Sequence, residues 1–182
     1  QLIGQFYLDP YARVGKRPGA WMDDVRGRWT RPDTQGTQTP VAHLVCNFAK
    51  GVGGKPALLT HDDVTTLFHE FGHALHGMFS KVKYPSLAGT NTSRDFVEFP
   101  SQFNEHWALD PKVFAHYAKH YKTGEAMPQE LVDKILKARS FNQGYATTEY
   151  LSAALLDLAW HTQKADAPLQ DVGAFHASAL KK

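Results

Sequence analysis

The sequence predicts a mainly α-helical fold with a small β-sheet. Residues 61–80 place apolar side chains three, four and seven positions apart, which is typical of an amphipathic helix buried on one side. The strand signals lie within residues 1–60, whereas helical patterns fill the sequence from residue 61 onward. Because the strands come early and the helices late, we expect a helical domain with a small sheet beside it.

The first part of the chain carries two strand signals separated by a long connection. Residues 6–8 predict a short strand that ends at an Asp-Pro turn. Residues 13–40 are rich in Gly, Pro and polar residues, and they predict an irregular connection anchored at residues 20–22. Residues 41–48, VAHLVCNF, form the strongest strand pattern. Connections as long as the one before this strand usually serve a site, so we expect it to pack near one.

The helices are predicted from their caps and apolar faces. Thr60 occupies the N-cap position of the central helix, and Asp62 and Asp63 place negative charge in its first turn, where the helix dipole favours it. The second helix is predicted to begin at Thr92 or Ser93, with an aromatic stripe on one face. Later helices are predicted over residues 111–121, 128–141 and 147–163, and a last one begins near Leu169.

The composition is that of a globular domain and excludes several classes of function. The net charge of the 182 residues is +2, and no basic run is longer than Lys181-Lys182, so neither nucleic acid nor an anionic membrane is an expected partner. No apolar run reaches the roughly 18 residues of a membrane span. The single cysteine, Cys46, predicts a buried thiol without an internal disulfide, in keeping with a cytoplasmic location.

The central helix contains the sequence HEFGH, from His69 to His73. Two histidines four residues apart project from one helical face and lie close enough to bind one zinc ion. The intervening Glu70 would then reach a water molecule on the metal and act as a general base. The alternative is a helix that merely contains two histidines, but a well-capped amphipathic helix favours the metal site.

A catalytic zinc ion needs a third protein ligand and an open fourth position. His76 is the nearest candidate, but His69 and His76 would lie about 10 Å apart along the helix axis, too far for one ion. We expect His76 to pack beside the site instead. Glu98 and Glu105 of the next predicted helix are seven residues apart on one face, and spacing alone does not choose between them. The position of Glu98 near the start of that helix favours it.

Six segments of the sequence are distinctive as a set. HEFGHALH at 69–76 is followed by GTNTSRDFVEFPSQ at 89–102, and the others are GKRPGAWM at 15–22, NEHW at 104–107, FNQGY at 141–145 and LSAALLD at 151–157. Together these segments resemble the thimet oligopeptidase family of zinc metallopeptidases. The GTNT and LSAALLD stretches favour the peptidyl-dipeptidase branch of that family over its oligopeptidase A branch.

The resemblance implies a zincin-like catalytic core and a defined site. By that resemblance His69, His73 and Glu98 bind one Zn²⁺, which selects Glu98 over Glu105, and Glu70 serves as general base and then general acid. The implied activity is zinc-dependent hydrolysis of short peptides, with release of C-terminal dipeptides as the favoured reaction. An endopeptidase of the oligopeptidase A kind is the alternative within the family.

Compared with this family, the sequence resembles one part of a larger, mostly helical peptidase. Family members are several times longer, with a helical N-terminal half and a later Tyr-rich segment that binds the substrate carbonyl and the oxyanion. Residues 164–182 do not resemble that segment, and Tyr145 and Tyr150 are more typical of core or surface positions. We therefore expect residues 1–182 to form a partial catalytic domain, weakly active or inactive alone, with the remainder of the polypeptide as a partner.

Two further residues are predicted beside the metal. Asp95, one helical turn before Glu98, would accept a hydrogen bond from a metal-bound histidine, and Gln102, one turn after Glu98, is the second candidate. Asp95 would alternatively cap its own helix. The strand over residues 41–48 is expected to offer backbone groups to an extended peptide substrate, while the substrate-binding side chains stay unassigned.

Two other classes of protein stay open. An aminopeptidase would need a recognition site for a free α-amino group, and the sequence shows no clear motif for one. A non-catalytic zinc-binding remnant would have no need of Glu70, so the presence of this residue favours an enzyme.

Overall fold

The computed structural model describes residues 2–30, 33, 36–168 and 170–181 of the chain. The chain divides into two compact units, Gln1–Lys119 and His120–Lys182. Among the described residues, the strands belong to the first unit and the second unit is helical, so the predicted mainly α-helical fold with a small sheet is confirmed. Every helix in the described ranges is too short or too polar to traverse a lipid bilayer.

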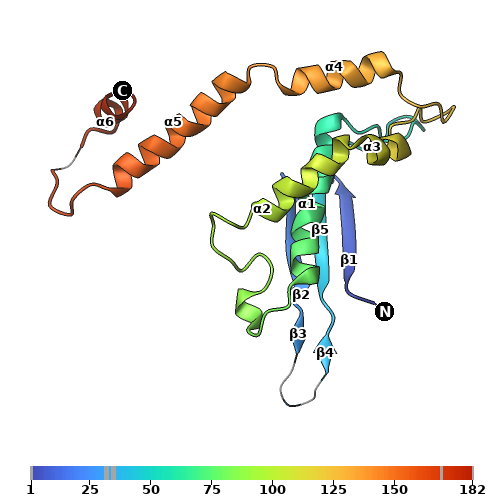
Figure 1. Cartoon of the computed structure of the whole chain (residues 1–182), viewed down its shortest axis with the longest axis horizontal. Helices are drawn as coiled ribbons and strands as arrows, with labels where there is room; N and C mark the ends of the chain where they lie inside the picture. The colour runs from blue at the N-terminus through green and yellow to red at the C-terminus, as the bar shows by residue number, and fades with distance from the viewer. Residues whose placement is uncertain (1, 31–32, 34–35, 169, 182) are drawn as a thin grey trace. The chain divides into compact units, whose positions relative to one another are not determined.

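A three-stranded sheet supports the first unit (Figure 1). Its central strand is β5 (Val41–Phe48), which pairs in parallel with β1 (Gln5–Tyr11) and in antiparallel with β2 (Trp21–Arg26). Leu44 and Cys46 of β5 are at most 1% exposed, as the apolar sequence of this strand requires. The predicted strand over residues 41–48 is therefore confirmed.

The two flanking strands differ from the prediction. β1 does not end at the Asp-Pro turn but continues to Tyr11, with an irregular register between Asp9 and Tyr11. Pro10 has no amide hydrogen to donate, and an edge strand tolerates this because one of its sides forms no ladder. The connection over residues 13–40, predicted to be irregular, contains β2 and a short ribbon of β3 (Trp29–Thr30) and β4 (Thr37–Gln38).

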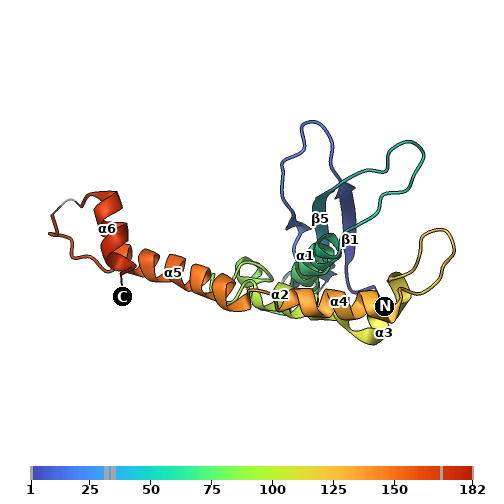
Figure 2. The ribbon, with the colours of Figure 1, turned by 90° about the horizontal axis from the view of Figure 1, so that it is seen from above.

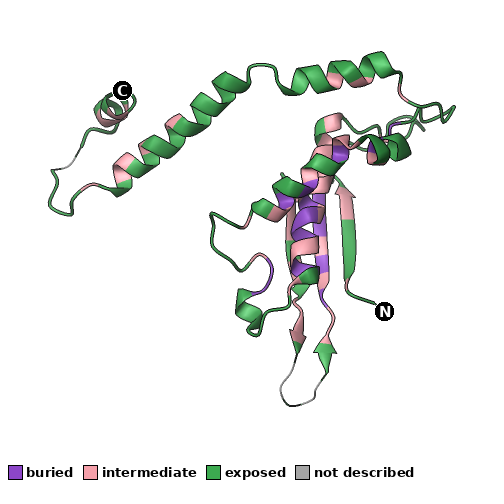
Figure 3. Cartoon of the chain, viewed as in Figure 1, coloured by how far each residue is buried: buried purple, intermediate pink, exposed green. Residues whose placement is uncertain are grey.

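Helix α1 (His61–Phe79) packs along the sheet over β5 (Figure 2). Its N-terminus is capped as predicted, because the Thr60 hydroxyl accepts a hydrogen bond from the Asp63 amide at 3.1 Å. The Asp63 carboxylate in turn accepts one from the Thr60 amide at 2.9 Å, which completes a capping box. Buried residues gather where α1 meets β5 (Figure 3), in a cluster of Ala42, Leu44, Ala74 and Met78.

Helix α2 (Phe99–Glu105) crosses α1 at Gly72. A β-carbon added to Gly72 would lie 2.6 Å from the Cα of Ser101 and 2.8 Å from the carbonyl oxygen of Pro100, so a larger residue would force the helices apart. The side-chain amide of Asn104 donates a hydrogen bond of 2.7 Å to the carbonyl of Phe68, which joins α2 to the backbone of α1. The crossing therefore brings the start of α2 to the middle of α1, where the HEFGH sequence lies.

The second helix begins later than predicted. Its first residue is Phe99 rather than a residue near Thr92 or Ser93, and Pro100 fits its first turn because no hydrogen bond is required from that position. Turns precede it, with the Val97 amide donating to the Ser93 carbonyl at 3.0 Å. The short elements around it are η1 (Pro85–Leu87), η2 (His106–Leu109) and α3 (Pro111–Tyr117), the last of which ends before the predicted residue 121.

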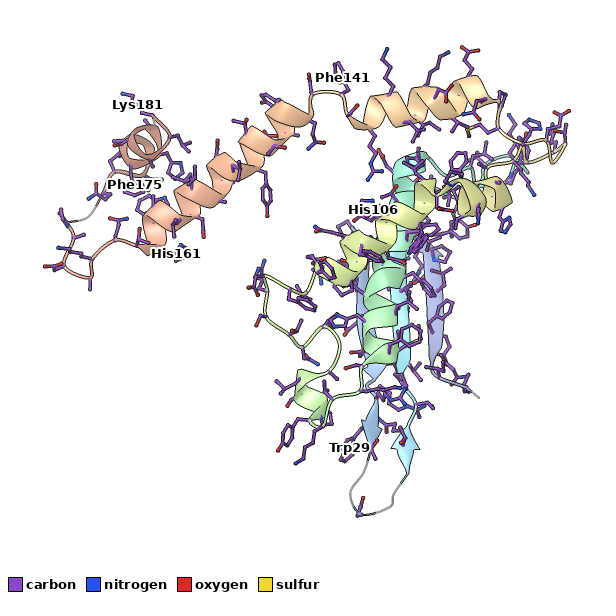
Figure 4. The ribbon with its side chains drawn as sticks, viewed as in Figure 1. Trp29, His106, Phe141, His161, Phe175 and Lys181 are labelled. Atoms are coloured by element: carbon purple, nitrogen blue, oxygen red, sulfur yellow. The ribbon has the colours of Figure 1, made fainter. Side chains whose placement is uncertain are left out.

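The second unit consists of α4 (Gln129–Arg139), α5 (Gln143–His161) and α6 (Val172–Ala179). Two of these confirm the helices predicted over residues 128–141 and 147–163, although α5 begins earlier. Phe175 of α6 is labelled in Figure 4, and its ring packs on that of Trp160, near the end of α5, with centroids 4.0 Å apart. Leu169, the predicted start of the last helix, lies outside the described residues, and α6 begins after Asp171, whose carboxylate accepts from the Ala174 amide.

We expect the substitution Gly72→Ala to lower the free energy of unfolding by about 1–3 kcal/mol, because the added methyl group would overlap the backbone of α2. Urea denaturation measures the change. Gly144→Ala in α5 is the matched control, since its added β-carbon meets no atom within 4 Å and alanine has the higher helix propensity. Equal stability of Gly72→Ala and the wild type would contradict the close crossing.

Candidate metal centre

Three side chains converge beside the crossing of α1 and α2. His69 and His73 lie one turn apart on α1, and their Nε2 atoms are 3.2 Å and 3.0 Å from the Oε2 of Glu98, respectively. The candidate ligand atoms of the three residues all lie within 4.8 Å of one another. Glu98, at the N-cap of α2, therefore completes a group that the two histidines begin.

The spacing of these atoms fits a zinc ion. Zinc is bound tetrahedrally at about 2.0–2.2 Å by histidine nitrogen and carboxylate oxygen, so two of its ligand atoms are separated by about 3.4 Å. The observed separations of 3.0 Å and 3.2 Å are slightly shorter. Because the Glu98 side chain is half exposed, a small outward movement would accommodate the ion. Two imidazoles and one carboxylate also match the ligand set of catalytic zinc sites.

The carboxylate of Glu98 is held in its ionised form. Burial acts to raise the pKa of Glu98, but a hydrogen bond from the Ser101 hydroxyl and the nearby histidines outweigh it and hold the pKa below its usual value. The Ser101 hydroxyl lies 2.8 Å from the Oε2 of Glu98. Burial lowers the pKa of His73, and the nearby charge of Glu98 opposes this shift. A lowered pKa favours the neutral imidazole, which is the form that binds a metal ion.

Glu70 lies between the two histidines and is only 5% exposed. Burial raises the pKa of its carboxyl, the charge of His69 opposes this rise, and the charge of Glu98 adds to it. A carboxylate with its pKa displaced toward neutrality is a more effective proton acceptor at physiological pH. Glu70 therefore has the position, and a raised pKa of the kind, that a general base between the two histidines requires, and its role as the base stays a prediction.

Glu70 and the three candidate ligands face a cavity of about 290 Å³. Trp21 and Met22 of β2 line it from the sheet, and Val97 lines it from the loop before α2. The connection between β1 and β5 therefore contributes directly to the site, as its length led us to expect.

The sequence profile described as peptidase family M3 matches residues 1–179. The chain belongs to peptidase family M3. This membership confirms the family resemblance found in the sequence and identifies the chain as part of a metallopeptidase.

Relatives of two kinds are found within the M3 family. The chain is 54% identical to the dipeptidyl carboxypeptidase of Escherichia coli (strain K12), over 98% of the chain and 26% of that protein. It is 52% identical to the dipeptidyl carboxypeptidase of Salmonella typhimurium, over 96% of the chain and 25% of the relative. It is 46% identical to the oligopeptidase A of Escherichia coli, over 90% of the chain and 24% of the relative. The chain thus spans about a quarter of the length of these relatives.

In this M3 chain, Glu105 contacts the site from the opposite side of His69. Its Oε1 lies 2.7 Å from the Nδ1 of His69, while Glu98 lies near the Nε2 of the same ring. A carboxylate on Nδ1 fixes the orientation of the imidazole and makes its other nitrogen a stronger metal ligand. Glu98 and Glu105, the two alternatives of the sequence analysis, therefore both contribute to the site in different positions.

Asp95 and Gln102, which were predicted for that outer position, are both exposed. Within the described part of the chain, neither forms a hydrogen bond with His69 or His73, and Glu105 lies beside His69 instead. The reason is the late start of α2, which leaves Asp95 in the preceding turns rather than one helical turn before the metal ligand.

Replacing Glu105 with Gln is expected to weaken zinc binding about 10- to 100-fold, because the carboxylate that orients His69 is lost. Competition with a chromophoric chelator measures the dissociation constant. Asp95→Asn removes the same charge from an exposed position in the turns before α2, and we expect it to leave the constant unchanged. A larger effect of Asp95→Asn than of Glu105→Gln would reverse the two assignments.

His76 and Cys46 lie near the site without belonging to the three-residue group. The His76 ring packs edge-on against Phe96 with centroids 6.0 Å apart, and burial lowers the pKa of His76 while Asp24 opposes the shift. Cys46 is completely buried, and burial chiefly raises the pKa of its thiol to about 11, which makes it unreactive. Cys46 thus has the buried role expected from the sequence, and His76 packs beside the site as expected, although its buried Nδ1 has no hydrogen-bond partner among the described residues.

Two buried polar residues of α2 that support the site, Ser101 and Asn104, were not predicted from the sequence. Ser101 donates to the carboxylate of Glu98, and Asn104 donates to the backbone of α1. A usable signal was the glycine at position 72, because a glycine inside a helix often marks a close neighbour. That signal indicates a close contact but does not identify the residues that make it.

Proposed function

We propose that the chain is the zinc-binding catalytic part of a peptidase that releases C-terminal dipeptides from oligopeptides. The observation that carries this proposal is the convergence of His69, His73 and Glu98 beside the buried carboxylate of Glu70. The similarity to proteins named dipeptidyl carboxypeptidase, at 52% and 54% identity, supports the exopeptidase reaction over endopeptidase cleavage.

His69, His73 and Glu98 would hold the zinc ion of a zincin-like core. When bound there, zinc supplies the Lewis acid that makes water a nucleophile at neutral pH. Glu70 accepts the proton of the attacking water and then donates it to the leaving amine of the cleaved bond. Glu105 keeps the His69 ring oriented throughout, because its carboxylate contacts the nitrogen that faces away from the ligand group.

The peptide substrate is proposed to lie along β2. The expectation that β5 would offer its backbone is wrong, since β5 is paired with β1 on one side and with β2 on the other. β2 is an edge strand of the sheet, and its Trp21 and Met22 line the cavity that contains the site. An extended peptide can add to such an edge through main-chain hydrogen bonds.

Two alternative functions are distinguished by what they do to a peptide. An endopeptidase of the oligopeptidase A kind, supported by the 46% identity to the oligopeptidase A of Escherichia coli, would cleave away from the C-terminus. A non-catalytic zinc-binding remnant would cleave nothing, but it would not require a buried carboxylate at position 70.

The test is incubation of the zinc-loaded protein with N-terminally blocked peptides of four to eight residues, with products identified by mass spectrometry. Successive loss of C-terminal dipeptides that a chelator abolishes and zinc restores is the expected result. Internal cleavage would favour the endopeptidase, and zinc binding without cleavage by the intact polypeptide would favour the remnant.

The activity of residues 1–182 alone is a separate proposal. Because the chain spans about a quarter of the length of its relatives, we propose that it hydrolyses peptides more slowly by itself than within its complete polypeptide, whose other parts are its partners. A cytoplasmic location likewise stays a prediction from the sequence.

A further inference from the structure

The loop that joins α1 to α2 folds back onto the C-terminal half of α1 (Figure 1). Its residues 88–91 form a tight turn, in which the Asn91 amide donates a hydrogen bond of 3.0 Å to the Ala88 carbonyl. Gly89 occupies the second position of this turn with a φ of +53°, which residues with a side chain rarely adopt. The Gly89 amide donates a hydrogen bond of 3.2 Å to the hydroxyl of Ser80, which follows α1. The turn is therefore fixed to the end of the helix.

Close packing between two glycines holds this turn against α1. A β-carbon added to Gly89 would lie 2.8 Å from the Cα of Gly77, so no larger side chain fits between the two backbones. Gly77 follows His73 by one helical turn, which is about 6 Å along the helix axis. Thr90, the residue after Gly89, lines the cavity that contains the candidate metal ligands.

The polar groups of Thr90 are available to a ligand in that cavity. Thr90 is half-buried, and within the described ranges neither its hydroxyl nor its amide forms a hydrogen bond. The other side chains that line the cavity are apolar or aromatic, or belong to the candidate metal ligands and Glu70. Thr90 therefore brings to the wall of the cavity a hydrogen-bond donor that the described part of the chain does not use.

A peptide bound along β2 would need such a donor. An extended peptide that pairs with the free side of β2 becomes the new edge of the sheet, and alternate main-chain groups on its outer side stay unpaired. A carbonyl that leaves water without gaining a new hydrogen bond weakens binding. Both β2, through Trp21 and Met22, and the turn, through Thr90, line the cavity, so a peptide held there lies within reach of both.

We propose that the hydroxyl of Thr90 donates a hydrogen bond to a main-chain carbonyl on the outer side of the bound peptide and so positions the substrate. The inference rests on the proposed function and on a peptide that lies along β2. Main-chain hydrogen bonds give affinity that does not depend on the side chains of the peptide. Because the contact is made to a carbonyl away from the cleaved bond, it is the same in the ground state and the transition state, and its loss should act on KM.

The test uses the intact, zinc-loaded polypeptide that contains residues 1–182, with N-terminally blocked peptides as substrates. Thr90→Val keeps the shape of the side chain but removes the hydroxyl, and we expect it to raise KM about 3- to 10-fold while kcat changes less than about twofold. Thr90→Ser retains the hydroxyl and should bring KM back toward the wild-type value. An unchanged KM in Thr90→Val, or a KM in Thr90→Ser as high as in Thr90→Val, would overturn the proposal.

A change in the substrate separates this contact from an indirect effect on the fold. In a series of peptides, one amide away from the cleaved bond is replaced in turn by a thioamide, whose sulfur accepts a hydrogen bond more weakly than oxygen does. In the wild type, the thioamide opposite Thr90 should raise KM, and Thr90→Val should abolish this penalty while leaving the penalties at other positions unchanged. Penalties that are equal in the two proteins at every position would show that Thr90 does not contact the peptide.

Thr92→Val is the matched control, because Thr92 is exposed and lies outside the set of described residues that line the cavity. Its KM should equal that of the wild type, and a rise as large as that in Thr90→Val would overturn the assignment to Thr90. Absence of zinc-dependent cleavage in the wild type would instead overturn the proposed function. In that case the dissociation constants of the blocked peptides, followed by tryptophan fluorescence, decide the role of Thr90, and equal constants for the wild type and Thr90→Val overturn it.

Discussion

Replacing Glu70 with Gln is expected to lower kcat for peptide hydrolysis about 10²- to 10⁴-fold while zinc stays bound. Glutamine has nearly the shape of glutamate and fits the same buried position, but its amide cannot accept a proton from the attacking water. The rate of dipeptide release and the zinc content of the purified protein are measured together. A loss of rate at full zinc occupancy identifies Glu70 as the base.

The control for this result separates chemistry from metal binding. Glu105→Gln also replaces a carboxylate near His69, and its loss of rate should be largely recovered at high zinc concentration, because it acts through metal affinity. The loss in Glu70→Gln should persist at any zinc concentration. A rate within a few-fold of the wild type for Glu70→Gln would remove this residue from the mechanism.

The second large effect concerns the third ligand. We expect Glu98→Ala to weaken zinc binding about 10²- to 10³-fold, since the 10–16 kcal/mol of a typical zinc site is shared among about four ligands. His69 and His73 of α1 would then be the only candidate ligands left, because α2 would supply none. Chelator competition at constant pH measures the dissociation constant, and peptide hydrolysis should fall in parallel.

The matched control for Glu98→Ala is Asp95→Asn, which also removes a charge from the segment before α2 but leaves the candidate ligands in place. Wild-type affinity in Glu98→Ala would show that the metal is bound elsewhere. Reduced affinity in both variants to the same degree would point to the total charge of the segment rather than to ligation.

The central helix and its chemistry could be predicted from the sequence because both depend on short-range order. The cap at Thr60, the apolar stripe of α1 and the two histidines one turn apart all follow from spacing along one helix. The candidate ligand Glu98 required more, since spacing alone did not choose between Glu98 and Glu105, its position near the helix start only favoured Glu98, and the family resemblance selected it.

The parts that could not be predicted depend on contacts between distant segments. β2 was not predicted because Asp23 and Asp24 interrupt the alternation of apolar residues that indicates a strand. Its pairing with β5 stabilises it despite the low strand propensity of these residues. The sequence predicts Asp95 beside a metal-bound histidine because the apparent cap at Thr92 or Ser93 predicts an early start of the second helix. Its true start at Phe99 moves Asp95 off the helix and leaves the position to Glu105.

Because α1 and α2 cross at Gly72, binding of a metal ion at the candidate site would stabilise the docked position of α2. Two candidate ligands belong to α1 and the third to the N-cap of α2, so the candidate ligand set is complete only while the helices are docked. An ion at 1,000 times its dissociation constant favours that docked arrangement by about 4 kcal/mol. By reciprocity, Asn104, which is not a candidate ligand, would contribute to the affinity for the ion through the hydrogen bond that holds α2 on α1.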